Sequence, residues 1–223
     1  MKKTSRFILC YVTERRSWRV ETGPNREPAL LQHIERAARA GIDWVQIREK
    51  ELPARELVEL TRAAIRACKN ASARSEARVV VNDRFDVARA AGAAGIHAGE
   101  TSLPIRVLVD ALHAAPLKNF LVGASRHSLD GAIDAAEAGA DYVFFGPVFE
   151  TPSKAAFGSP QGTAKLAQVC NAVSIPVIAI GGITLENARV CRDSGAAGIA
   201  AIRLFQDAAD IGEIVAALAT QMI

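Results

Sequence analysis

The sequence lacks most features that mark membrane, secreted or metal-finger proteins. No apolar run approaches the roughly 20 residues that a membrane-spanning helix needs, and the basic N-terminal stretch lacks a small-residue cleavage site. The 4 histidines have no metal-finger spacing, and the 4 cysteines are far apart with no CxxC pair: Cys10, Cys68, Cys170 and Cys191. We therefore expect a cytoplasmic protein with reduced cysteines and no membrane contact.

Net charge and aromatic content are low as well. The 27 basic and 24 acidic residues leave a net charge of +3, which is too small to indicate a nucleic-acid partner. Aromatic residues make up 5% of the chain, yet 50% of its residues are hydrophobic, mostly alanine and aliphatic residues. This composition excludes wholesale disorder and suits helices packed on a buried parallel sheet.

Eight short β-branched or aliphatic runs alternate with longer segments rich in alanine, leucine and arginine. Most runs show no apolar/polar alternation, as is typical of parallel strands covered on both faces. They predict strands at residues 7–12, 43–48, 78–82, 95–98, 121–125, 142–146, 176–181 and 198–202. Helical spacing of apolar residues predicts helices at 30–40, 52–68, 132–138 and 211–218, with Gly41 and Gly139 as left-handed caps.

Eight β-then-α units in 223 residues predict an α/β protein, a single (β/α)8 TIM barrel that forms one domain over residues 1–223. The doubly wound alternative would place a glycine-rich turn after the first strand. Thr13-Glu14-Arg15-Arg16 follow that strand instead, so the barrel is favoured. The two longest loops, 13–27 and 150–162, are where a barrel is expected to carry its chemistry.

Polar side chains gather where the predicted strands end, and barrel enzymes react at this C-terminal rim. Arg48 and Lys50 are two residues apart, so they can point the same way and bind phosphate oxygens. The alternative is a solvated ion pair with Glu49 or Glu51. Asn82-Asp83 could hold an amide-bearing ring and a divalent cation, or form an Asx turn.

Three further positions have both a structural and a functional interpretation. Ser102 precedes Leu103-Pro104, so we expect it to cap the next helix. His127 suits acid/base chemistry at neutral pH, or it caps the loop before the next helix. Gly181-Gly182 could bring backbone N–H groups to a phosphate, or form a tight turn.

Five blocks of sequence resemble the thiamine phosphate synthase / thiazole tautomerase family. They are VQIREK (45–50), VNDRFDVA (81–88), GASRHS (123–128), GADYVFFGPVFETPSK (139–154) and IPVIAIGGIT (175–184). The resemblance extends from about Tyr11 to Phe205 and implies a (β/α)8 barrel. Synthases of this family join hydroxymethylpyrimidine diphosphate to hydroxyethylthiazole phosphate, release pyrophosphate and use Mg²⁺. Phosphorylated pyrimidine and thiazole are therefore the expected small-molecule partners.

The resemblance also assigns roles to individual residues. We expect Lys50, Ser125, His127 and Lys154 to be catalytic, and the resemblance implies that Asp83 holds Mg²⁺. Glu100 is the other expected metal ligand, although the family does not have a carboxylate at its position. The implied substrate-binding residues are Gln46, Arg48, Lys50, Asn82, Ser125, Thr151, Ser153, Lys154, Gly182, Ile202 and Arg203. Arg203 stands where the family usually has serine, and it either adds a contact to the thiazole phosphate or points away.

The sequence departs from the synthase pattern at IHAGETSLP (96–104). Synthases resemble HxGQxDxP there, with the Asp as their second metal ligand, whereas this chain has Ser102 and, in place of Gln, Glu100. Either Glu100 supplies the missing charge or diphosphate handling is weakened.

Three functions therefore stay open. The intact basic residues and Asn82-Asp83 favour the synthase. A thiazole tautomerase with His127 as its acid/base is the alternative, and a non-catalytic barrel that binds a phosphate ligand is the third. A homo-oligomer is compatible with each of them.

Overall fold

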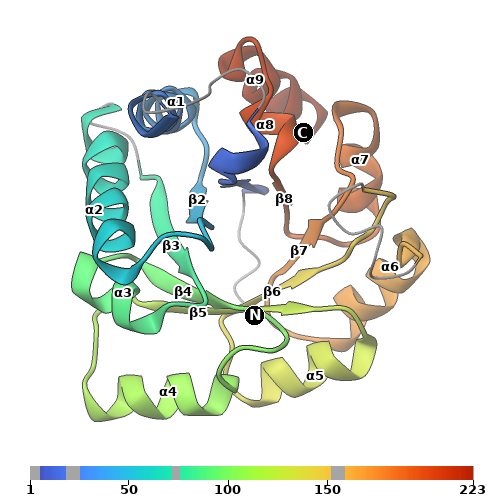
Figure 1. Cartoon of the computed structure of the whole chain (residues 1–223). Coiled ribbons are helices and arrows are strands. Elements are labelled where there is room, and N and C mark those ends of the chain that lie inside the picture. Colours follow the sequence, from blue (N-terminus) through green and yellow to red (C-terminus); the bar gives the residue numbers. More distant parts are fainter. Residues whose placement is uncertain (1–5, 19–25, 72–75, 152–158, 223) are drawn as a thin grey trace.

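Eight parallel strands close into a barrel in the order β1-β2-β3-β4-β5-β6-β7-β8, and helices form a ring outside it (Figure 1). The computed structural model describes residues 6–18, 26–71, 76–151 and 159–222. The strands are β1 (Ile8–Val12), β2 (Trp44–Ile47), β3 (Arg78–Asn82), β4 (Gly95–Ala98), β5 (Leu121–Arg126), β6 (Tyr142–Phe145), β7 (Val177–Ile180) and β8 (Gly198–Ala201). All eight predicted strands and the predicted TIM-barrel fold are confirmed.

The helices follow the strands in a regular alternation. They are η1 (Arg15–Ser17), α1 (Arg26–Ala40), α2 (Ala54–Ala71), α3 (Phe85–Ala91), α4 (Ile105–Ala114), α5 (Leu129–Glu137), α6 (Gly162–Ala172), α7 (Leu185–Asp193), α8 (Arg203–Gln206) and α9 (Ile211–Gln221). The four predicted helices are α1, α2, α5 and α9. The predicted left-handed glycines are confirmed, because Gly41 has a φ of 106° and Gly139 a φ of 96°.

The strands are apolar along their length because they separate two cores. Outward-facing side chains such as Val45, Val81 and Ile199 pack against the helices. The inward-facing side chains fill the barrel itself, which is a packed core and not a pore; they include Ile8, Cys10, Val12, Trp44, Tyr142, Phe144, Ile178 and Ala200. Below its mouth, the barrel interior is therefore filled by apolar and aromatic side chains.

Within the described ranges, none of the helices has the length and apolar character that crossing a membrane requires. The four cysteines are free thiols, and Cys10, Cys68 and Cys191 are buried.

Candidate active site

The last inward-facing side chains of β2, β3, β4 and β5 form a polar layer at the barrel mouth. Gln46, Asn82, His97 and Ser125 hold these positions, between outward-facing apolar neighbours. Gln46 Nε2 donates to Asn82 Oδ1 at 3.0 Å, and His97 Nε2 lies 2.8 Å from Ser125 Oγ. The structure thus brings three predicted substrate residues, Gln46, Asn82 and Ser125, to one end of the barrel.

A cleft of about 230 Å³ opens beside this layer. Its lining combines Lys50, Asn82 and Asp83 with Glu49, Leu52, Leu57 and Arg84. Lys50 is exposed, and the structure gives its ammonium no hydrogen bond or ion pair with a described residue. Its positive charge is near enough to lower the pKa of Asp83. The cleft therefore presents a cation, an amide and a carboxylate to one small space.

The Asp83 carboxylate is held by three donors. Oδ1 accepts from the Gly99 amide at 2.8 Å and from the Ser102 hydroxyl, and Oδ2 accepts from Asn82 Nδ2 at 2.6 Å. Burial raises the pKa of Asp83, but hydrogen bonds from Ser102, Gly99 and Asn82, together with the charge of Lys50, outweigh burial and lower it. Asp83 is therefore an anchored carboxylate that stays ionised.

The prediction that Ser102 caps the next helix is wrong. α4 begins at Ile105 with Pro104 as its N-cap residue, so Ser102 lies too far upstream to reach the first free N–H groups of the helix. Its hydroxyl donates to Asp83 instead, and hydrogen bonds to an ionised group are stronger than those between neutral groups. Ser102 thus belongs to the site through Asp83.

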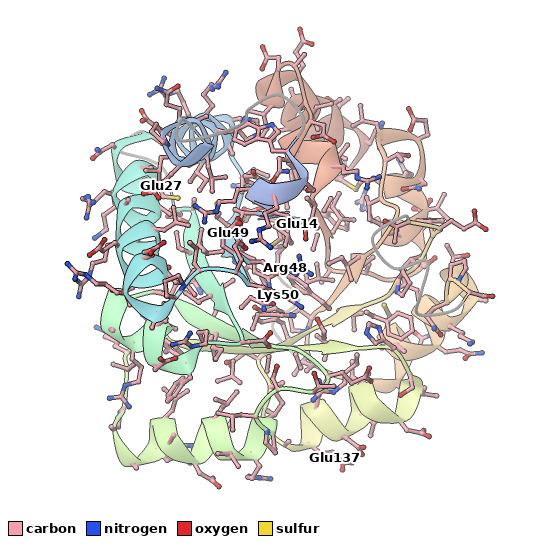
Figure 2. All side chains as sticks on the ribbon, viewed as in Figure 1. Glu14, Glu27, Arg48, Glu49, Lys50 and Glu137 are labelled. Carbon is pink, nitrogen blue, oxygen red and sulfur yellow. The ribbon has the colours of Figure 1, made fainter. Side chains whose placement is uncertain are left out.

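Arg48 has a different ion-pair partner from the two that the sequence suggested. Its Nη1 lies 2.8 Å from Glu14 Oε1, whereas Glu49 and Glu51 bind Arg15. Figure 2 shows Glu14, Arg48, Glu49 and Lys50 together at the barrel mouth. The alternative of an Arg48 pair with Glu49 or Glu51 is therefore wrong, because the loop after β1 brings Glu14 to the end of β2.

The backbone of Glu14 is held by Gln206, the last residue of α8. Its amide donates to Gln206 Oε1 at 3.0 Å, and Gln206 Nε2 donates back to the Glu14 carbonyl oxygen at 3.0 Å. Gln206 is buried at the end of α8. The carboxylate that holds Arg48 is thus fixed by a residue from the opposite end of the chain.

Glu49 is a buried carboxyl group that stands between Arg48 and Lys50 in the sequence. Its side chain accepts from the Arg15 amide at 3.0 Å and is hydrogen-bonded to Thr13. Burial raises its pKa to about 7, although the hydrogen bonds from Thr13 and Arg15 oppose that shift. Thr13 Oγ1 also accepts from the Arg48 amide at 3.1 Å, so Glu49 fixes the loop that frames the basic residues.

The two predicted metal ligands have different partners. Asp83 is held by Ser102, whereas Glu100 Oε2 lies 3.6 Å from His127 Nε2. The described residues contain no group of three or more His, Cys, Asp and Glu side chains that could hold a metal ion. A single carboxylate still fits Mg²⁺ when phosphate oxygens and water complete the coordination, and Asp83 offers that carboxylate.

His127 is held by the backbone of the next strand connection. Its Nδ1 donates to the Gly146 carbonyl oxygen, because a carbonyl oxygen can only accept. This bond directs Nε2 toward Glu100. The alternative was that His127 caps the loop before α5. The structure gives the capping contact to Ser128, which accepts from the Gly131 amide, whereas His127 binds the Gly146 carbonyl oxygen.

Close packing explains both glycines at the end of β7. Gly181 and Gly182 have φ values of 97° and 66°, which favour glycine. A Cβ on Gly182 would lie 2.4 Å from the Glu150 carbonyl oxygen, and one on Gly181 would lie 2.5 Å from Pro147 Cβ. The glycine pair therefore lets the segment after β6 pack directly on the β7–α7 turn.

The remaining predicted residues lie on the same rim where they are described. Ile202 is half-buried and Arg203 is exposed at the start of α8, and Thr151 is half-buried after β6. Ser153 and Lys154 lie outside the described residues. Sequence reasoning missed Glu14, the function of Ser102 and the partners of His97; the inward position of His97 on its strand was the available signal for the last of these.

Comparison with known proteins gives one consistent family. Residues 20–205 match the family model described as thiamine monophosphate synthase. The chain is 40% identical over 195 residues to a thiamine-phosphate synthase of Chlorobium luteolum, covering 87% of this chain and 83% of the other. It is 41% identical over 181 residues to that of Moorella thermoacetica, covering 81% and 82%. A solved thiamine phosphate pyrophosphorylase from Pyrococcus furiosus superposes with a TM-score of 0.80 at 32% identity, covering 97% of this chain and 95% of the other.

Proposed function

Because the chain belongs to the thiamine monophosphate synthase family, we propose that it is a transferase that joins hydroxymethylpyrimidine diphosphate to hydroxyethylthiazole phosphate and releases pyrophosphate. The observation that carries this proposal is the convergence of Gln46, Asn82, Lys50 and Asp83 at one barrel mouth. These groups suit an amide-bearing ring attached to a polyanion.

The pyrimidine end of the substrate is assigned to Gln46 and Asn82. Each amide carries both donors and acceptors, and their mutual hydrogen bond of 3.0 Å fixes the orientation of the pair. An aminopyrimidine ring offers the same mixture of donors and acceptors along its edge. The amide pair would therefore bind the ring in one orientation and place its methylene carbon toward the basic residues.

The diphosphate is assigned to Lys50 and Arg48. The carbon–oxygen bond to the diphosphate breaks, and the electron-rich pyrimidine stabilises the cation that remains on the methylene carbon. Positive charge preorganised around the leaving anion lowers the barrier for this step. Arg48 can serve the substrate only by leaving or sharing its Glu14 partner, so the free protein holds this guanidinium near its working position.

The thiazole phosphate is assigned to another part of the same rim, near Gly182 and Ile202, after β7 and β8. α7 begins at Leu185, shortly after Gly182, and α8 begins at Arg203, directly after Ile202. Helix N-termini favour phosphate groups. The thiazole nitrogen then attacks the methylene cation and forms the new carbon–nitrogen bond. Holding both substrates by their anionic ends brings the two reacting atoms together.

Asp83 is the residue that we assign to Mg²⁺, with Glu100 as the second predicted carboxylate ligand. Asp83 stays ionised and points into the cleft that also contains Lys50. Mg²⁺ bound there would neutralise the charge of the leaving pyrophosphate. We also propose a cytoplasmic location, where the four free thiols remain reduced.

The decisive experiment supplies both phosphorylated substrates and Mg²⁺ to the purified protein and measures thiamine phosphate. We expect Lys50→Ala to lower kcat/KM by about 100-fold, whereas Lys165→Ala, on α6, leaves it unchanged. Absence of thiamine phosphate with folded protein would reject the proposal. Aromatisation of the thiazole that is abolished by His127→Ala would identify the tautomerase instead.

A further inference from the structure

A chain of three polar side chains crosses the interior of the barrel directly beneath the candidate site. The Tyr142 hydroxyl lies 3.2 Å from His97 Nδ1, and His97 Nε2 lies 2.8 Å from Ser125 Oγ. The chain crosses three neighbouring strands, β4, β5 and β6. Gly123 on β5 provides the space, because a Cβ there would lie 2.0 Å from the Tyr142 ring.

The hydrogen bond of Tyr142 fixes which atoms donate and which accept among these three side chains. Within the described structure, the buried Tyr142 hydroxyl has His97 Nδ1 as its hydrogen-bond partner. Burial raises the pKa of Tyr142 well above its ordinary value, and the nearby Cys10 and Asp141 add to that shift. The phenol therefore keeps its proton and must donate it, since a buried donor without an acceptor is costly. His97 Nδ1 is then the acceptor.

A neutral imidazole that accepts at Nδ1 carries its proton at Nε2. His97 Nε2 then donates to Ser125 Oγ, so one lone pair of the hydroxyl oxygen is occupied. The proton of the Ser125 hydroxyl is left to point elsewhere. Ser125 is half-buried at the barrel mouth, on the side where the substrate would bind.

Ring packing holds the His97 and Tyr142 side chains in place. The His97 ring centroid lies 4.2 Å from that of Phe144, and the Tyr142 ring centroid lies 4.6 Å from that of Trp44. His97 and Tyr142 are each 1% exposed. Side chains packed this tightly inside a barrel have one rotamer available, so the orientation of His97 is set before any ligand arrives.

We propose that Tyr142 and His97 are positioning residues that make Ser125 a hydrogen-bond donor toward the leaving diphosphate. The inference rests on the proposed function for the identity of that anion. The hydrogen-bond arrangement itself does not depend on turnover. The Tyr142 hydroxyl selects one tautomer of His97, and that tautomer orients Ser125. Anions bind better to a hydroxyl that can only donate than to one whose proton is used elsewhere.

The tautomer can be measured directly by ¹⁵N NMR of the histidine side chains. We expect the proton of His97 at Nε2 and an unprotonated Nδ1 in the wild-type protein. Tyr142→Phe removes the donor while keeping the ring, so the spectrum should shift toward a mixture of tautomers. A wild-type His97 with its proton at Nδ1 would overturn the proposal.

A double-mutant cycle tests whether Tyr142 acts through Ser125. We expect Ser125→Ala to lower kcat by about 100-fold and Tyr142→Phe to lower it by about fivefold, with both KM values changed less than about twofold. In the Ser125→Ala background, Tyr142→Phe should have almost no further effect. An undiminished fivefold loss in that background would show that Tyr142 acts only through packing. It would refute the proposed relay of hydrogen bonds from Tyr142 through His97 to Ser125.

Pyrophosphate binding separates failure of this inference from failure of the proposed function. Calorimetry with Mg²⁺ and pyrophosphate requires no turnover, and we expect Tyr142→Phe to weaken binding about fivefold while urea unfolding confirms the fold. If the protein forms no thiamine phosphate but Tyr142→Phe still weakens pyrophosphate binding, the relay is supported and the synthase assignment is rejected. Unchanged pyrophosphate affinity in Tyr142→Phe contradicts the relay itself.

Discussion

The Asp83 carboxylate is ionised because neutral donors surround it, and Ser102 is one of them. A second carboxylate at position 102 would repel Asp83 unless a cation lay between them. The hydroxyl avoids that repulsion, so the free site does not need a metal ion to hold Asp83 in place. At residues 96–104 the chain thus departs from the synthase pattern by having a hydroxyl that donates to Asp83 where synthases have a second carboxylate.

Ser102→Asp should convert this site into one that depends on Mg²⁺. Without the ion we expect a lower melting temperature, because two carboxylates then share one space. With the ion, half-maximal activity should need about tenfold less Mg²⁺, since a carboxylate is a better ligand than a hydroxyl. Melting curves and Mg²⁺ titrations check both effects, and Ser102→Asn is the uncharged control. An unchanged Mg²⁺ titration contradicts the assignment of Asp83.

Glu49 makes a testable contribution to the pH dependence of stability. Its pKa is raised from 4.5 to about 7 in the folded protein, so the unfolded chain releases this proton at lower pH than the folded protein does. The folded state thus binds more protons across this window, and stability falls as pH rises from about 4.5 to 7.

Glu49→Gln should remove that fall. The gain in stability of the variant over the wild type should increase by about 3 kcal/mol between pH 4.5 and pH 8, as measured by urea unfolding. Glu51→Gln is the matched control, because hydrogen bonds and charge from Arg15 lower the pKa of Glu51 despite its burial. Its effect should have the opposite sign. Parallel pH profiles for wild type and Glu49→Gln would show that burial of the Glu49 carboxyl does not cause the fall.

At the scale of elements, the β7–α7 turn is coupled to the segment after β6. The Val148 amide donates to the Ile180 carbonyl oxygen at 2.9 Å, and the Phe149 amide donates to that of Gly181 at 3.0 Å. Gly182 lies directly against Glu150. A change at this glycine therefore moves two parts of the rim, including the approach to Thr151.

Gly182→Ala should destabilise the protein by about 3 kcal/mol, through left-handed strain and overlap with the Glu150 carbonyl oxygen. Gly162→Ala is the matched control, because Gly162 has a φ of 75° but no atom within 4 Å of the added Cβ. It should cost about 1 kcal/mol, from strain alone. Urea unfolding measures both, and equal losses would show that the close approach contributes nothing.

The strands were predictable from sequence, and several helices were not. Strands buried on both faces leave continuous apolar runs, which is why all eight were found. α3 (Phe85–Ala91) and α7 (Leu185–Asp193) each bury only two side chains, Val87 and Ala88 in α3 and Ala188 and Cys191 in α7. Two buried positions are too few for a helical period to be recognised. The family motifs located the rim residues, but not their partners.

Pairs between distant loops explain what sequence reasoning missed. Glu14 meets Arg48, and Ser102 meets Asp83, only because the barrel brings separate strand ends together. No local rule of spacing relates residues 34 positions apart. The wrong prediction that Ser102 caps a helix had the same origin. The local sequence of Ser102 suits a helix cap, but its contact with Asp83 across the rim determines where its hydroxyl points.

For the whole molecule, the site is shared among the ends of most strands, so a bound ligand should stabilise the entire barrel. Pyrophosphate with Mg²⁺ at 100 times its Kd should add about 2.7 kcal/mol to the free energy of unfolding. Thermal melts with and without EDTA measure this gain. Lys50→Ala should lose most of the gain and Lys165→Ala should retain it; equal stabilisation of both variants would place the anion elsewhere.

The hydrogen bonds between Glu14 and Gln206 join a residue that is made early in synthesis to one that is made late. A growing polypeptide that has not yet reached residue 206 has the loop after β1 but not the glutamine that holds it, so Arg48 lacks its fixed counterion. The anion-binding mouth is consequently completed only after residue 206 has been made and β8 has paired with β1.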